Sequence, residues 1–195
     1  MTLAIKKIFP NFYRFSKNLT NQLPAKSSLW DKKTYNFNLR IKKMLNLWES
    51  NELKNEANIV YKSYEGGDFI DIGAYSGFYS FLLSPKANSY ENFISCEPDV
   101  DAHFELFNNL SILKKNFKFI NYSAITAPIS NGKEVVIAHD DWGHPCFLDL
   151  DQTNKKNSEI KKKFKSITID SLVKNFSLKP TFIKIDTEGA EHDVW

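Results

Sequence analysis

The sequence predicts an α/β domain built on a mostly parallel sheet. Apolar strand segments alternate with helical patterns beyond residue 65, and this order implies right-handed crossovers between parallel strands. Three of the strands end in an acidic residue, which places three acids at one edge of the sheet. A chain of 195 residues, 42% of them hydrophobic, is also long enough to bury such a core. We therefore expect a main domain over residues 46–195, preceded by an N-terminal arm or helical extension over residues 1–45.

The composition narrows the classes of partner. The formal net charge is +3 and is carried almost entirely by lysines without regular spacing on one face, which disfavours nucleic acid as a partner. No apolar run approaches the length of a membrane span. The two cysteines, Cys96 and Cys146, lack the spacing of metal ligands. We expect no bound metal and a reducing, cytoplasmic compartment.

The N-terminal arm admits two interpretations. Aromatic residues mix with basic ones between residues 6 and 17, as in an amphipathic helix that docks on the domain or on a membrane surface. Pro10 and the mostly polar run Asn18–Ser28 favour a loosely packed arm instead. Helical spacing begins at Leu39 and continues to Tyr64, where a turn leads into the first strand of the main domain.

The main domain is organised around residues 68–79, which read as a buried strand, a tight turn and a helix start. Asp71 interrupts the apolar run at the carboxyl end of the strand, where α/β sheets bind ligands. Gly73 allows a sharp turn, and Gly77 allows the next helix to lie close to the strand. Ser76 is placed to cap that helix. A purely structural strand–turn–helix that carries Asp71 by chance is the alternative.

The same alternation continues along the chain. Further strands are expected over Phe93–Cys96, Phe117–Ile125, Glu134–His139, Ser166–Asp170 and Thr181–Asp186. Helices are expected over Phe78–Leu83, from Asp99 or Asp101 onward with a broad buried face that includes Phe104 and Phe107, and around Ser171–Phe176. The lysine run Lys155–Lys165 predicts a solvated face or loop.

Three acids mark the expected ligand crevice: Asp71, Glu97 and Asp186. Each ends a strand of the predicted parallel sheet, and the carboxyl ends of such strands converge. Glu97 follows Asp71 by 26 residues (97 − 71), at the end of the second strand, where a carboxylate can accept two hydrogen bonds from ribose hydroxyls. One such acid alone usually caps a helix or a turn, whereas three in register indicate a nucleoside cofactor.

The turn itself distinguishes between cofactors. A dinucleotide fingerprint places a glycine where this chain has Tyr75, because the backbone must approach a pyrophosphate. S-adenosylmethionine has no pyrophosphate, so a looser G-x-x-x-G loop suffices. The helix N-terminus beyond Gly77 can face its carboxylate, and Asp71 can balance its cationic part. A nucleotide-sugar or dinucleotide enzyme is the less favoured alternative.

These motifs resemble a known family, the FkbM-type S-adenosylmethionine-dependent methyltransferases. The matching segments are Asp71–Gly77, Glu97–Pro98, Ile169–Leu172 and Lys184–Glu191. The resemblance runs from about Glu65 to the C-terminus. It implies a Rossmann-like class I methyltransferase fold and methyl transfer to the hydroxyl oxygen of a sugar, a glycan or a secondary metabolite. The family often carries Asn at the position of Tyr75.

The resemblance and the residues together predict two sets of site residues. The cofactor-binding set is Asp71, Gly73, Ala74, Tyr75, Gly77 and Glu97. The catalytic set is Asp186, as general base or acceptor-orienting acid, with Glu188 and Glu191 on the adjacent turn. His192 is a weaker candidate. The alternative is that Asp186 and Glu191 cap the next helix or pair with Lys184.

Two further features leave their role open. The loop residues His139, Asp140, Asp141 and His144 either line an acceptor pocket or form plain surface, and their spacing specifies no metal. The resemblance implies more strands after Asp186, yet the sequence ends nine residues later (195 − 186). We therefore expect a fold truncated after its fourth core strand, with a catalytically incomplete cofactor-binding domain as the alternative function.

Overall fold

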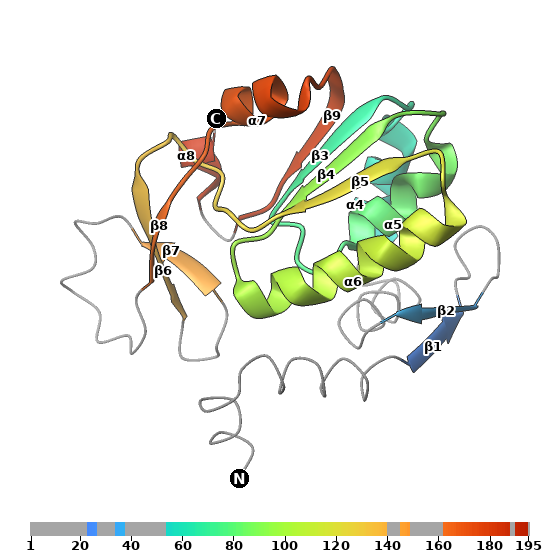
Figure 1. Ribbon diagram of the computed structural model, residues 1–195, viewed down its shortest axis with the longest axis horizontal. Coiled ribbons are helices and arrows are strands. Elements are labelled where there is room, and N and C mark those ends of the chain that lie inside the picture. Colours follow the sequence, from blue (N-terminus) through green and yellow to red (C-terminus); the bar gives the residue numbers. More distant parts are fainter. Residues whose placement is uncertain are drawn as a thin grey trace, which may run out of the picture.

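A four-stranded parallel sheet forms the centre of the molecule in a computed structural model, which describes residues 23–26, 34–37, 54–139, 145–148, 162–187 and 190–194. The strand order is β5 (Asn121–Ile125), β4 (Asn92–Cys96), β3 (Asp68–Ile72) and β9 (Pro180–Ile185) (Figure 1). All three neighbouring pairs are parallel, so the expected α/β fold with a mostly parallel, Rossmann-like sheet is confirmed.

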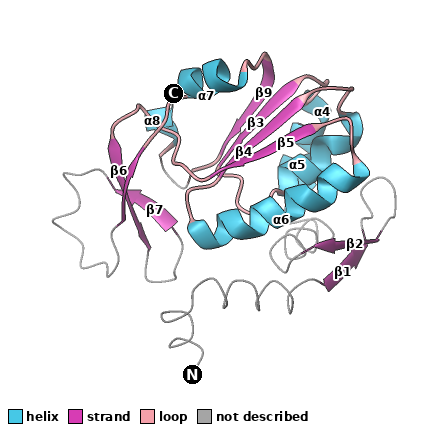
Figure 2. Ribbon diagram, viewed as in Figure 1, coloured by secondary structure: helices cyan, strands magenta, loops and turns pink. Residues whose placement is uncertain are grey.

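Helices cover both faces of this sheet (Figure 2). One face carries α4 (Lys54–Ser63), α5 (Phe78–Leu83), the 3₁₀ turn η1 (Ser84–Lys86) and α6 (Val100–Asn116), and the other carries α7 (Ile169–Phe176) and α8 (Glu191–Val194). Asp99 caps α6, with its Oδ1 accepting from the N–H of Ala102 at 2.7 Å. No helix in the described ranges is long and apolar enough to cross a membrane.

The two faces of the sheet are filled by different residue types. Phe69, Phe93 and Phe182 line the α4–α6 face, and the ring of Tyr64 packs among them with centroid distances of 5.9–6.2 Å. Aliphatic residues such as Ile70 line the opposite face. Because side chains alternate along a strand, the next residue after Phe69 on the aromatic face is Asp71. The central strand β3 therefore places the Asp71 carboxylate on the same buried face as Phe69.

A second, antiparallel sheet lies beside the carboxyl ends of the parallel strands, near α8 (Figure 1). Its order is β7 (Pro145–Leu148), β6 (Glu134–His139) and β8 (Lys162–Lys165). The end of the lysine run therefore forms a strand, because β6 offers it a pairing edge, and Lys163 and Lys165 on it are exposed, as expected for a solvated face. A separate antiparallel pair, β1 (Leu23–Lys26) and β2 (Thr34–Phe37), falls within the expected arm.

The strand expected over Ser166–Asp170 is wrong. Only Ile167 forms a bridge there, with Ile129, and α7 already begins at Ile169. The Oγ1 of Thr168 accepts from the N–H of Ser171 at 3.1 Å, and this cap starts the helix despite the β-branched residues.

Three details around α5 and α6 also differ from expectation. Gly77, not Ser76, is the N-cap of α5, and the Ser76 hydroxyl is buried without a hydrogen-bond partner among the described residues. A Cβ on Gly77 would lie 2.9 Å from Leu106 Cδ1, so the absence of a side chain there makes room for α6. The expected role of Gly77 was to let α5 lie close to the strand. Phe107 is 56% exposed, because α6 turns a narrower apolar face to the core than its composition suggests.

Candidate active site

The three predicted acids come together at one edge of the sheet. Asp71 lies near the end of β3, while Glu97 and Asp186 directly follow β4 and β9. These strands are parallel neighbours in the order β4-β3-β9, so their carboxyl ends lie side by side. The convergence that the sequence predicts is therefore present in the fold.

Residues 73–77, the glycine loop, connect β3 to α5 across the ends of both neighbouring strands. The N–H groups of Gly73 and Ala74 both donate to the carbonyl of Cys96 at 3.0 Å. Gly73 has φ +74°, and a Cβ there would overlap the carbonyl oxygen of Asp186. Only glycine combines this backbone conformation with this contact. The loop is thereby held between the ends of β4 and β9.

Glu97 fixes the middle of the glycine loop. Its Oε2 accepts from the N–H of Tyr75 at 2.9 Å, and its Oε1 accepts from the N–H of Asp99 at 2.8 Å. A carboxylate oxygen can accept more than one hydrogen bond. The buried Glu97 therefore orders the loop with a group of the type that also accepts from ligand hydroxyls.

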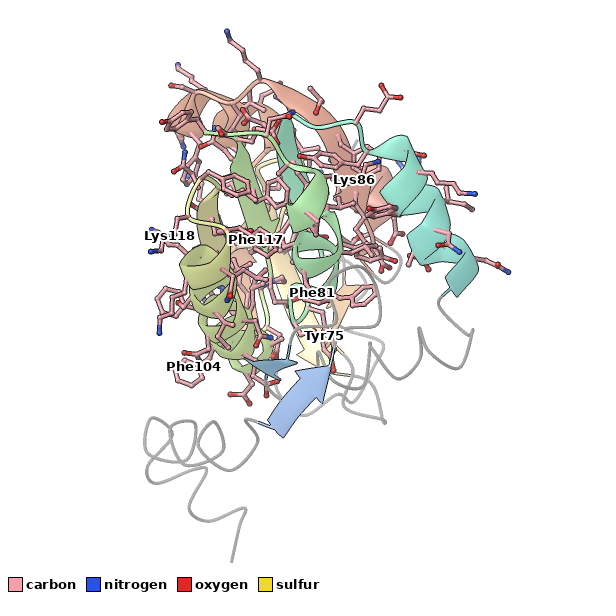
Figure 3. All side chains as sticks on the ribbon, turned by 90° about the vertical axis from the view of Figure 1, so that its right-hand side faces the viewer. Tyr75, Phe81, Lys86, Phe104, Phe117 and Lys118 are labelled. Carbon is pink, nitrogen blue, oxygen red and sulfur yellow. The ribbon has the colours of Figure 1, made fainter. Side chains whose placement is uncertain are left out.

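Tyr75 takes an unusual backbone conformation in this loop. Its φ of 50° lies in the left-handed region, which bulky side chains rarely adopt. The residue is 42% exposed. Figure 3 shows Tyr75, Phe81 and Lys86 in this order from the glycine loop through α5 to η1.

Lys184 lies among the acids. It pairs in register with Asp71 across β3 and β9, and its Nζ lies 3.5 Å from Asp71 Oδ1 and 3.2 Å from Asp186 Oδ2. It also donates to the carbonyl of Gly73 at 3.2 Å and lies 4.9 Å from the centroid of the Tyr79 ring. The sequence indicates Lys184 only as an alternative partner of Asp186 or Glu191. A lysine within an apolar strand requires a buried partner, and Asp71 provides one.

The environment of Asp71 is unusual for a carboxylate. The side chain is fully buried, and neither of its oxygens accepts a hydrogen bond from the described residues. Burial raises the pKa of Asp71, the charge of Lys184 opposes that rise, and the charge of Asp186 adds to it. Asp186 itself is open, with 58% of its side-chain surface exposed. The two acids that share one lysine thus differ in their access to solvent.

Tyr79 contacts Lys184 through the face of its ring. Burial raises the pKa of the Tyr79 hydroxyl, and so does its hydrogen bond to Glu56. The hydroxyl therefore stays protonated and donates to Glu56, while the face of the ring meets the Lys184 ammonium.

The remaining predicted catalytic residues lie beyond β9. Glu191 is on α8, and its Oε1 accepts from the N–H of Thr187 at 2.7 Å and from the Thr187 hydroxyl at 3.1 Å. These contacts order the turn after Asp186. The structural alternative predicts pairing with Lys184, and Asp186 makes that pair at 3.2 Å. His192 is exposed on α8, and Glu188 falls outside the described residues.

The polar loop after β6 adds nothing further to the described site. Asp140, Asp141 and His144 fall outside the described residues, as does the side chain of His139. In the ranges that the structure covers, no group of three His, Cys, Asp or Glu residues could hold a metal ion.

The fold is that of a Rossmann-like methyltransferase domain. The family model for the methyltransferase FkbM domain matches residues 71–194, which span the site from Asp71 to α8. The chain belongs to this FkbM methyltransferase family, and the resemblance in its motifs is confirmed. A search of curated proteins and a search of solved structures found no match.

Proposed function

We propose that the chain transfers the methyl group of S-adenosylmethionine to a hydroxyl oxygen of a sugar, a glycan or a secondary metabolite. The observation that supports this is the juxtaposition of a loop held by Glu97 with an exposed carboxylate, that of Asp186, at neighbouring strand ends. Family membership supports methyl transfer, and the identities of donor and acceptor are the parts proposed here.

The residues present fit S-adenosylmethionine better than a dinucleotide. Glu97 is a carboxylate at the end of the second strand, where ribose hydroxyls are bound, and Tyr75 stands where a pyrophosphate would need glycine. None of the surface of Asp71 is exposed, so its carboxylate does not contact the cofactor directly. It acts on a bound sulfonium or ammonium through its electrostatic field. When bound, S-adenosylmethionine supplies a methyl group that its own positive charge activates.

The protein must then orient the acceptor and remove its proton. A hydroxyl is a weak nucleophile, and a positioned base contributes roughly 10²–10⁴ in rate. Asp186 is the open acid of the cluster, so an acceptor hydroxyl can reach its carboxylate and lose its proton to an Oδ atom. The same exposure lets Asp186 return that proton to water. Glu191 orders the turn that follows and thereby supports the position of Asp186.

Two measurements test this function. Calorimetric titration with S-adenosylmethionine, S-adenosylhomocysteine and NAD should show binding of the first two only. Transfer of a labelled methyl group should then be assayed on a panel of sugars and glycans with free hydroxyls. Asp186→Asn should abolish transfer and leave cofactor affinity unchanged, whereas Asp170→Asn, at an exposed acid in the first turn of α7, should change neither.

Two outcomes would overturn the proposal. If the chain binds NAD but does not bind S-adenosylmethionine, then S-adenosylmethionine is excluded as the methyl donor. Full transfer by Asp186→Asn would remove Asp186 as the base, and binding of the donor without transfer to any acceptor would favour a cofactor-binding domain that lacks activity.

A further inference from the structure

Lys184 contacts three parts of the cluster that the proposed function uses. It reaches a buried acid, Asp71, an exposed acid, Asp186, and the backbone of the glycine loop at Gly73. Its side chain is only 9% exposed. A lysine that only balanced the charge of Asp71 would not need the other two contacts.

The order of Lys184 comes from its buried contacts. The ion pair with Asp71, the hydrogen bond to the Gly73 carbonyl and the face of the Tyr79 ring restrict the ammonium group from three sides. An exposed ion pair is usually weak because two long side chains must be ordered together. Here the lysine is already ordered, so the pairing at 3.2 Å only has to restrict the short side chain of Asp186.

We propose that Lys184 is a positioning residue, whose ammonium group holds the Asp186 carboxylate in one orientation beside the glycine loop. This inference rests on the proposed function, because it gives the orientation of Asp186 its purpose. Misplacement of a reacting group by about 1 Å costs on the order of 10²-fold in rate. Lys184 thus serves catalysis through Asp186 without itself contacting the acceptor.

The test has to separate positioning from charge balance. Lys184→Met alone leaves a buried, unpaired Asp71, and this change is itself strongly destabilising. The double variant Asp71→Asn/Lys184→Met removes both buried charges and preserves the approximate volume. This variant tests whether Asp186 still functions when the core contains neither of the two buried charges. Lys115→Met, at an exposed lysine in the last turn of α6, is the matched control.

Three readouts apply to each variant. The reference for the double variant is Asp71→Asn alone, which has lost the same carboxylate charge. The double variant should bind S-adenosylhomocysteine within about threefold of that reference, because the loop keeps its bonds to Cys96 and Glu97. Its kcat should fall roughly 10²-fold below that of the reference. The three-bond coupling between the Asp186 backbone nitrogen and its Cγ should change from the value of one rotamer to an average. Lys184→Arg, which keeps the charge, should retain a single rotamer and recover part of the rate.

The outcomes distinguish this inference from the function on which it rests. A double variant with the kcat of Asp71→Asn and a single Asp186 rotamer would show that Lys184 only balances charge, and the inference would be overturned. Failure of the wild type to bind S-adenosylhomocysteine or S-adenosylmethionine would overturn the proposed function. The Asp186 coupling needs neither cofactor nor acceptor, so it decides the positioning role in either case.

Discussion

The carbonyl oxygen of Asp186 occupies the space that a side chain on Gly73 would need. The N–H of Asp186 also donates to the carbonyl of Ile72 at 3.0 Å. The start of the glycine loop and the end of β9 are therefore packed backbone against backbone. A shift of either one moves the other, so the glycine loop is linked to Asp186, the proposed base.

Replacement of Gly73 by alanine should show this contact. We expect Gly73→Ala to lower the free energy of unfolding by about 3 kcal/mol, since a positive φ costs roughly 1–2 kcal/mol and overpacking a further 1–3 kcal/mol. Gly132→Ala is the matched control, with a φ of +85° but its nearest neighbour, Thr168 Cγ2, at 3.4 Å. That variant should lose about 1 kcal/mol. Urea denaturation measures both, and equal losses would contradict the close contact.

Glu97 should contribute to stability and to cofactor binding together. Glu97→Gln removes the charge that accepts from the N–H groups of Tyr75 and Asp99, and hydrogen bonds to a charged group contribute about 1.5–3 kcal/mol. We expect a loss of this order in the free energy of unfolding, and roughly tenfold weaker binding of S-adenosylmethionine. Glu134→Gln, at an exposed position in β6, should change neither value. Unaltered affinity in Glu97→Gln would exclude Glu97 from ribose binding.

Tyr75 should tolerate replacement by asparagine. Both Tyr75 (φ 50°) and Tyr90 (φ 68°) are in the left-handed region, which asparagine adopts more readily. We expect Tyr75→Asn and Tyr90→Asn each to raise the free energy of unfolding by about 1 kcal/mol. The affinity for S-adenosylmethionine should stay within about threefold in both, because Tyr75 meets Glu97 through its backbone. A tenfold loss confined to Tyr75→Asn would show that its ring contacts the cofactor.

The buried carboxyl of Asp71 should make stability depend on pH. Burial raises the pKa of Asp71 above its ordinary value of 3.8. Between the unfolded and folded pKa values the folded chain keeps a proton that the unfolded chain has released, so stability falls as the pH rises through this window. Asp71→Asn has no such proton. The Tm difference, variant minus wild type, should therefore increase as the pH rises above about 4.

The neighbours of Asp71 do not change this sign. The raised pKa values of Tyr79 and Cys96 keep both groups protonated across the range. Asp170→Asn, at an exposed acid in the first turn of α7, is the control for the loss of one carboxylate. A constant or shrinking difference for Asp71→Asn would contradict the raised pKa.

The central sheet and the convergence of its acids could be predicted because they follow from local patterns. Apolar runs of strand length separated by helices leave few topologies other than parallel pairing. Once the strands are parallel, residues at their carboxyl ends must be neighbours, and the places of Asp71, Glu97 and Asp186 follow. The roles assigned to these residues stay predictions until a cofactor and an acceptor have been tested.

The contacts between distant segments could not be predicted in the same way. The register that pairs Asp71 with Lys184 depends on how β9 aligns beside β3, across more than a hundred residues of chain. The expected cap at Ser76 was wrong because the left-handed Gly77 starts α5. The strand β8 depends on pairing with β6, which a lysine-rich sequence does not indicate.

The three-stranded sheet β7-β6-β8 shares no strand with the four-stranded sheet, and the chain enters it after β5 and leaves it before α7. Residues in it can change without disturbing the register of β3, β4 and β9. For engineering, the sheet β7-β6-β8 is therefore a segment that can be replaced while the register of the four-stranded sheet is kept.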